Sequence, residues 1–281
     1  MFSNGILNDF LTDPRGALLV FLLALPGRLL AISAHEAAHG WMAERCGDPT
    51  ARMMGRVTLN PLKHLDPVGI ACMLLFGIGW AKPVPVNPYN FRSYRRDDLK
   101  VSLAGITMNL ILFVIGCIAM YAAIAAALIA VPYQPVFLGT EDVVRTIYNG
   151  VPAIISGEYW IGLTDLMNYG VGLADFLIAP VFGKIAGYAY EMLSYFVMTN
   201  LVLAVFNLIP IPPLDGYHVL NDLVLKGRLF ASRKAQSAGM AIMYVLMFTG
   251  KLSELLGYVY DAVLNGVGGL MTAVFRAFGV F

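Results

Sequence analysis

The stretch from Val101 to Val131 constrains the fold most, because its apolar character is almost uninterrupted. A helix needs ~20 apolar residues, at ~1.5 Å each, to cross the hydrocarbon layer of a bilayer, and this stretch exceeds that length. Three more candidates run from Ala17 to about Ala43, from about Ile185 to Leu208 and from about Ala235 to Tyr260. The pattern predicts an all-α polytopic membrane protein with about four transmembrane helices.

Composition supports this class. Of the 281 residues, 58% are hydrophobic and only 13% are charged, whereas about a quarter of a soluble domain is charged. A net charge of +1 leaves no basic surplus for phosphates, which argues against a nucleic-acid partner. The N-terminus lacks the cationic region and cleavage site of a signal peptide, so we expect the first apolar run to be retained.

A shorter apolar run, VGIACMLLFGIGW from Val68 to Trp80, has too few residues to cross as a helix. The AKPVPVNPYNF stretch after it alternates valine with proline, an extended pattern. Lysine and arginine outnumber acidic residues on both sides of the run, so both flanks should be cytoplasmic. We therefore expect a re-entrant or β-hairpin segment that returns to its own side.

The same charge rule predicts the organisation of the rest of the chain. Residues 132–184 carry an acidic excess and should form an outward-facing insertion, and residues 210–234 are basic and should lie inside. We expect a single membrane-embedded domain over residues 1–281, with a core at about 17–225 and C-terminal helices at 235–281. The tail after Asp261 would be an amphipathic surface helix. The compact size suggests a multi-pass protein of a prokaryotic cytoplasmic membrane.

The first span ends in His35-Glu36-Ala37-Ala38-His39, an HExxH pattern. Residues at i and i+4 share a helix face, so both imidazoles can reach one metal ion, with Glu36 beside them to take a proton from water. The alternative is a buried histidine pair satisfied by neighbours in the helix. Two of the four histidines of the chain fall into this pattern, in a setting where unsatisfied polar groups are costly.

A catalytic zinc takes three protein ligands and leaves one position open. Cys46 lies on nearly the same helix face as His39 but ~10 Å further along the axis, too far to share the ion. Asp215 follows the proline cluster that ends the third span, on the same cytoplasmic side. From sequence chemistry alone, Asp215 as third ligand and Asp215 as an ordinary turn residue both stay open.

Three motifs in order carry a family resemblance: HEAAH, then GITMNL from Gly105 to Leu110, then NLIPIPPLDG from Asn207 to Gly216. Together they resemble the site-2 protease family of intramembrane zinc metalloproteases, over about residues 18–225. The chain departs from many members where Ile106-Thr107-Met108 replaces a proline-containing motif, and no stretch is long enough for a PDZ domain. The resemblance implies one Zn²⁺ ion bound by His35, His39 and Asp215, Glu36 as general base, Asn207 holding substrate or oxyanion, and Asn109 positioning substrate.

The implied activity is peptide-bond hydrolysis in or near transmembrane segments of membrane-protein substrates, at the cytoplasmic edge of the bilayer. The segment from Trp80 to Phe91 could pair with an unwound substrate strand. One alternative is a non-proteolytic zinc-binding membrane scaffold or transporter, which needs no base at Glu36. Another is a membrane HExxH protease acting on soluble or prenylated ends, which typically takes glutamate as its third ligand. His64 could be a gate or contact substrate, but its place in a basic loop favours a solvated side chain. His218, three residues after Asp215, could contact the metal ligands or replace one of them, although we do not expect it to.

Overall fold

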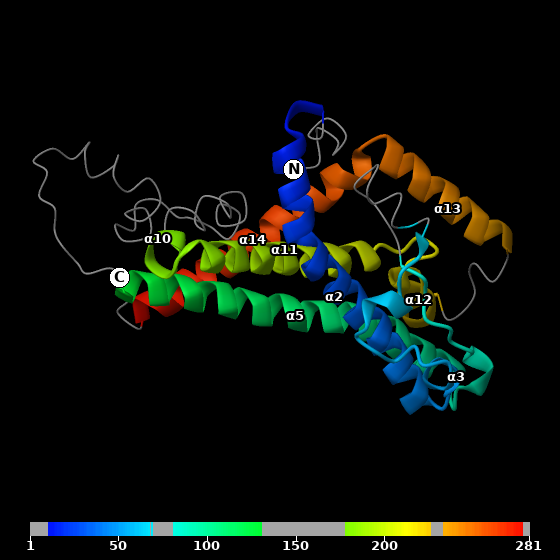
Figure 1. The fold of residues 1–281 in the computed structure, drawn as a ribbon. Coiled ribbons are helices and arrows are strands. Elements are labelled where there is room, and N and C mark those ends of the chain that lie inside the picture. The colour runs from blue at the N-terminus through cyan, green and yellow to red at the C-terminus, as the bar shows by residue number, and fades with distance from the viewer. Residues whose placement is uncertain (1–10, 68, 70–80, 131–177, 226–232, 278–281) are drawn as a thin grey trace, which may run out of the picture.

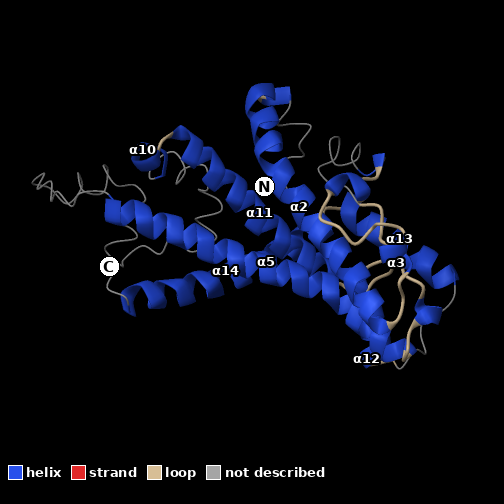
Figure 2. Ribbon diagram, turned by 60° about the horizontal axis from the view of Figure 1, so that its bottom comes forward, coloured by secondary structure: helices blue, strands red, loops and turns tan. Residues whose placement is uncertain are grey.

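The computed structural model describes residues 11–67, 69, 81–130, 178–225 and 233–277 (Figure 1). Over these ranges it is helical and contains no sheet (Figure 2). Three described helices are long and apolar enough to cross a membrane: α2 (Pro14–Cys46), α5 (Tyr94–Ala130) and α11 (Lys184–Asn207). The chain is therefore a multi-pass membrane protein, as its hydropathy predicts.

Local sequence explains where α2 begins and ends. The Asp13 side chain accepts a hydrogen bond from the Gly16 amide, and Pro14 occupies the first helical position, where a missing N–H costs nothing. The helix continues past Pro26 and ends at Gly47, whose left-handed φ of 110° is typical of a helix C-terminus. This length carries HExxH into the last third of the helix.

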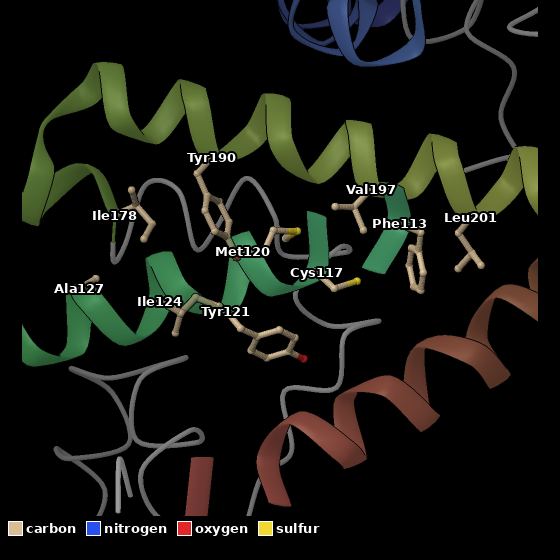
Figure 3. Close-up of a cluster of buried hydrophobic side chains, with 10 residues drawn as sticks. All are labelled: Phe113, Cys117, Met120, Tyr121, Ile124, Ala127, Ile178, Tyr190, Val197 and Leu201. Carbon is tan, nitrogen blue, oxygen red and sulfur yellow. The ribbon is translucent and has the colours of Figure 1, made fainter. Parts of the chain in front are cut away.

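The three long helices pack against one another, and α5 and α11 lie side by side (Figures 1 and 3). Their seam buries Met120 and Ile124 of α5 against Val197 and Leu201 of α11. The outer faces instead expose large apolar side chains, as lipid-facing helices do. Examples are Leu22, Ile115 and Ile185.

The expected fourth span, residues 235–260, is divided between α13 (Arg233–Phe248) and α14 (Lys251–Ala277). The break falls at Gly250, whose φ of 72° suits glycine and stops the helix. Helix α14 then runs straight through Asp261, so no separate surface helix begins there. Its residues Tyr260, Val263 and Val267 pack against the α5–α11 seam.

Residues 70–80 lie outside the described part of the chain, but the two ends of this run lie together. Leu65 and Ala81 form an isolated antiparallel bridge, and the Lys82 amide donates to the His64 carbonyl at 2.8 Å. The described ends of the run thus lie side by side, and a re-entrant course of the run itself stays a prediction. Within the described residues this bridge is all that exists of a β-hairpin. The short helices α3 (Thr50–Met53), η1 (Pro61–Lys63) and η2 (Pro88–Asn90) lie in this connection.

Most of the expected outward insertion, residues 131–177, also lies outside the described part; α10 (Ala179–Phe182) follows it and leads into α11. At the opposite end of the bundle, the end of α2 and the start of α5 meet the end of α11 and α12 (Asp215–Leu223) (Figures 1 and 2). This end holds the HExxH histidines.

Candidate metal centre

Three potential metal ligands converge between α2 and α12. The Nε2 atoms of His35 and His39 are 3.0 Å apart, and they lie 3.3 Å and 3.2 Å from Asp215 Oδ2. Four ligands ~2.1 Å from a tetrahedral zinc ion are about 3.4 Å from one another, so this triangle is close to the size that zinc requires. The structure thus brings together the three residues that the sequence motifs single out.

The second nitrogen of each imidazole has its own partner. His35 Nδ1 lies 2.6 Å from Asn109 Oδ1, and His39 Nδ1 lies 2.7 Å from the Val101 carbonyl oxygen. Both oxygens are acceptors, so the hydrogen sits on Nδ1 in each ring. With an ion bound, each Nε2 would offer its lone pair to the centre, the arrangement of metal-binding histidines. Without an ion, a proton on Nε2 can instead bond to Asp215 Oδ2.

Asn109 continues the network into α11. Its Nδ2 donates to Asn200 Oδ1 at 2.8 Å, and Asn200 Nδ2 donates to the Phe196 carbonyl at 2.9 Å. Both asparagines are fully buried. Substrate positioning by Asn109 stays a prediction, but its observed contacts are to His35 and to the bundle. Sequence reasoning missed Asn200, although an amide inside an apolar span is a signal of function.

Space for an ion depends on Gly105. A Cβ atom built on this residue would lie 2.5 Å from His39 Nε2 and 2.6 Å from His35 Cε1. Any other residue would therefore press on both imidazoles. The glycine of the second motif keeps α5 close to the histidines without crowding them.

The Asp215 carboxylate is suited to a cation. Burial alone would raise its pKa, but hydrogen bonds and charge from His35 and His39 outweigh burial and hold the pKa below its ordinary value. Its buried Oδ2 atom faces the two imidazoles and has no other hydrogen-bond donor among the described residues. A buried anionic oxygen with such neighbours fits a metal ligand.

Glu36, the residue after His35, is held by a backbone amide. Its Oε2 accepts a hydrogen bond of 2.7 Å from the Val84 N–H. Val84 stands between Pro83 and Pro85, which have no N–H, so it is the only amide donor of these three residues. The extended segment that precedes α5 therefore fixes one oxygen of the proposed base.

This extended segment is itself tied to the region after α2. Arg56 Nη2 donates to the Lys82 carbonyl at 2.7 Å, and Asp48 Oδ2 accepts from the Asn87 amide at 2.7 Å. The sequence assigned neither residue a role, since single charged residues in a basic loop give no signal of their partners. Pairing of this segment with a substrate strand stays a prediction, and Trp80 lies outside the described residues.

The remaining candidates lie in different settings. Asn207 is in the last turn of α11, and its Nδ2 donates to the Leu203 carbonyl of the same helix at 2.9 Å, so its role toward substrate stays a prediction. The expectation that His64 is solvated is wrong, because it is 1% exposed and its Nε2 contacts the Thr58 carbonyl at 2.8 Å. His218 pairs with Asp98 at 3.0 Å rather than with the metal ligands.

Comparison with known proteins agrees with the geometry. The family model described as Peptidase family M50 matches residues 21–250. A Bacillus subtilis (strain 168) protein named "Putative zinc metalloprotease YwhC" is 32% identical over 248 residues, covering 88% of this chain and 90% of the relative. The Mycolicibacterium smegmatis protein named "Putative zinc metalloprotease Rip2" is 26% identical over 272 residues, covering 92% and 82% respectively.

No solved structure gives a significant match. The family match nevertheless spans most of the chain, and it includes both the HExxH helix and the aspartate that completes the ligand group. The chain therefore belongs to peptidase family M50, the site-2 protease family of zinc metalloproteases.

Proposed function

We propose that this chain is an intramembrane protease that uses one zinc ion to hydrolyse peptide bonds in or near transmembrane segments of membrane proteins. One observation carries the proposal. Two imidazoles and a carboxylate converge at one end of a bundle of apolar helices, with Glu36 in the next position of the same helix.

The donor set fits zinc. Two histidines and one carboxylate are a common catalytic triad of ligands, which leaves the fourth position to water or substrate. A zinc ion bound by His35, His39 and Asp215 would polarise a peptide carbonyl and make water more acidic. The Nδ1 contacts of both histidines keep the rings oriented for that task.

Glu36 is the proposed general base. Its Oε2 stays on the Val84 amide, and its Oε1 is then left to accept a proton from water. The same oxygen can return the proton to the departing amine nitrogen. Asn207, on the last turn of α11, would hold the substrate carbonyl or the negative charge that develops on it.

Position along the helices supports cleavage near the cytoplasmic edge. By helical rise, His39 lies about 10 Å before the end of α2 at Cys46, and Gly105 about 16 Å after the start of α5 at Tyr94. This end of the bundle is basic, as cytoplasmic ends are. Its cations include Arg45, Arg92, Arg95, Arg96 and Lys100. A prokaryotic cytoplasmic membrane is the proposed location.

Replacing Glu36 by glutamine tests the proposal. Glu36→Gln keeps the amide acceptor for Val84 but cannot take a proton, so zinc stays bound while cleavage of a model transmembrane substrate falls by about 10²–10⁴-fold. Purified protein would be assayed for zinc content and for product on gels. The matched control is Glu44→Gln. Glu44 lies on the same helix but pairs with Arg52, so this substitution should leave zinc content and cleavage unchanged.

A scaffold or transporter gives another result. Zinc would bind, yet the wild-type protein would cut none of several transmembrane substrates, and Glu36→Gln would behave like wild type. A protease for soluble or prenylated ends would cut such peptides in preference to a transmembrane segment in the same assay. Either outcome would overturn the proposed function.

A further inference from the structure

One face of α5, near the start of the helix, carries a row of residues that faces the metal ligands or the helix of the third ligand. Asp98, Val101, Gly105 and Asn109 follow one another at spacings of three and four residues, so they lie on the same face of the helix. Val101 and Asn109 hold the two imidazoles, and Gly105 leaves them room. Asp98 extends the same row by one turn and has no assigned role.

Asp98 contacts the helix that carries the third ligand. Its Oδ2 lies 3.0 Å from His218 Nδ1, and the Asp98 residue is 8% exposed. Asp215, His218 and Asp222 are spaced by three and four residues, so they share one face of α12. The face that presents the metal ligand is therefore the face that docks on α5.

A second contact joins the two helices further along. Arg95 Nη2 donates to the Asp222 carbonyl oxygen at 2.6 Å. Burial of Asp222, together with the charge of Asp98, raises the pKa of Asp222 to about 6, as expected where two carboxyl groups face each other. His218 stands against Asp98, and hydrogen bonding to Asp98 raises the pKa of His218.

Helix α12 needs such an anchor. It has 9 residues, and isolated helices shorter than ~12 residues are only marginally stable in water. The chain before it contains Pro210, Pro212 and Pro213, whose rings supply no N–H to an adjoining helix. Backbone hydrogen bonds such as Leu214 N–H to the Ile211 carbonyl shape the turn that leads into α12. Contacts with α5 add the side-chain anchors that hold the helix, and with it Asp215, against the bundle.

We propose that Asp98 is a positioning residue for the metal site: through His218 it docks α12 on α5 in the register that places Asp215 against His35 and His39. The inference rests on the proposed function only in requiring that these three residues bind zinc. It assigns Asp98 no contact with substrate or metal.

The test is zinc affinity of the full-length protein in detergent, measured by competition with a chelator. Asp98→Asn and His218→Gln should each raise the zinc Kd about tenfold, the lower end of what outer-shell partners of metal ligands contribute. Because the two residues act as one pair, the double variant should bind zinc no more weakly than the weaker single variant.

Asp97→Asn is the matched control. Asp97 is the neighbouring carboxylate of α5, 4% exposed, and it binds the Ser93 amide and Lys100 rather than α12. It should leave the zinc Kd unchanged. The His218 side chain is half-exposed, so we expect His218→Gln to fold even if replacement of the buried Asp98 prevents folding.

Cobalt provides a readout that loss of stability alone would not move. Tetrahedral Co²⁺ absorbs visible light strongly, and a loosened Asp215 should weaken these bands in folded Asp98→Asn or His218→Gln protein. The inference, but not the proposed function, would be overturned if His218→Gln had wild-type zinc affinity and spectra. It would also be overturned if Asp97→Asn lost as much zinc affinity as Asp98→Asn. A wild-type protein that binds no zinc would overturn the proposed function as well.

Discussion

Gly105 shows how a single residue can decide whether the metal site exists. Gly105→Ala adds a Cβ that would lie 2.5 Å from His39 Nε2, so we expect zinc affinity to fall more than 100-fold. The helix itself should not suffer, because alanine favours a helix over glycine by about 1 kcal/mol. Zinc content after dialysis, with circular dichroism for the fold, measures both effects.

A second glycine serves as its control. Gly257 lies in α14, and a Cβ there would meet no atom within 4 Å. Gly257→Ala should therefore retain zinc. Normal zinc binding in Gly105→Ala would show that the imidazoles approach the ion from another direction.

We expect Asn109 and Asn207, the two asparagines of the motifs, to serve different functions. Asn109→Leu removes the acceptor of the His35 Nδ1–H inside the bundle, so zinc affinity should fall about 10- to 100-fold. Asn207 bonds only to its own helix in the described contacts, so Asn207→Leu should keep zinc but slow cleavage. Chelator competition and substrate turnover, measured on both variants, test this division. A loss of zinc in Asn207→Leu would contradict it.

Residues of the site differ in how far the sequence could predict them. His35, Glu36 and His39 are neighbours on one helix turn, so their spacing alone predicts a shared ion. Asp215 is distant in sequence, and only the order of the motifs selected it over an ordinary turn aspartate. Asn200 could have been noticed as an amide inside an apolar span, but its partner Asn109 could not be predicted, nor could the contact of the Val84 amide, because these contacts depend on how separate segments pack.

At the scale of elements, the junction of α12 with α5 should respond to pH. Both His218 and Asp222 have raised pKa values, so the folded protein holds their protons more tightly than the unfolded chain does. Their contribution to the free energy of unfolding is full at low pH. It falls between about pH 4 and 6 for Asp222 and above about pH 6.5 for His218. The ionisable groups at this junction include Tyr94, Arg95 and Asp98 of α5 and Asp215, Tyr217, His218 and Asp222 of α12.

Thermal unfolding of zinc-free protein measures this effect. The difference in Tm between wild type and His218→Gln should be on the order of 2 °C at pH 6 and should shrink by pH 9. Comparing the two proteins removes the titration of the metal ligands that they share, apart from the interaction between the charge of Asp215 and His218. A difference that stays constant over this range would mean that the charge of His218 does not hold α12.

Elements that face lipid were the easiest to predict, because composition alone decides whether a long segment can enter a bilayer. That rule identifies α2, α5 and α11. It fails for residues 235–260, where Gly250 divides an apolar stretch and Lys251 with Glu254 begins a new helix. Hydropathy averages over such a break and does not register the backbone angle of one residue.

At the scale of the whole molecule, apolar packing and polar contacts occupy different parts of the helix bundle. The α5–α11 seam is filled with apolar side chains, with α14 packed along it (Figure 3). Polar groups gather near the end of α2. Most of them bond to a different segment of the chain, as His35, His39 and Glu36 do. The apolar bundle thus supports the polar end, and the proposed catalytic groups lie at that end.

Orientation of the molecule in the membrane follows from the basic end of the bundle and can be tested by labelling. Cysteines introduced at Tyr89, 94% exposed beside the site, and at Leu11, 75% exposed before α2, mark opposite ends. The native cysteines would first be replaced by alanine. A maleimide that cannot cross membranes should then label Leu11→Cys in intact cells but Tyr89→Cys only in inverted vesicles. The reverse pattern would put the metal ligands at the outer face, and substrates would then have to be cut from the other side of the bilayer.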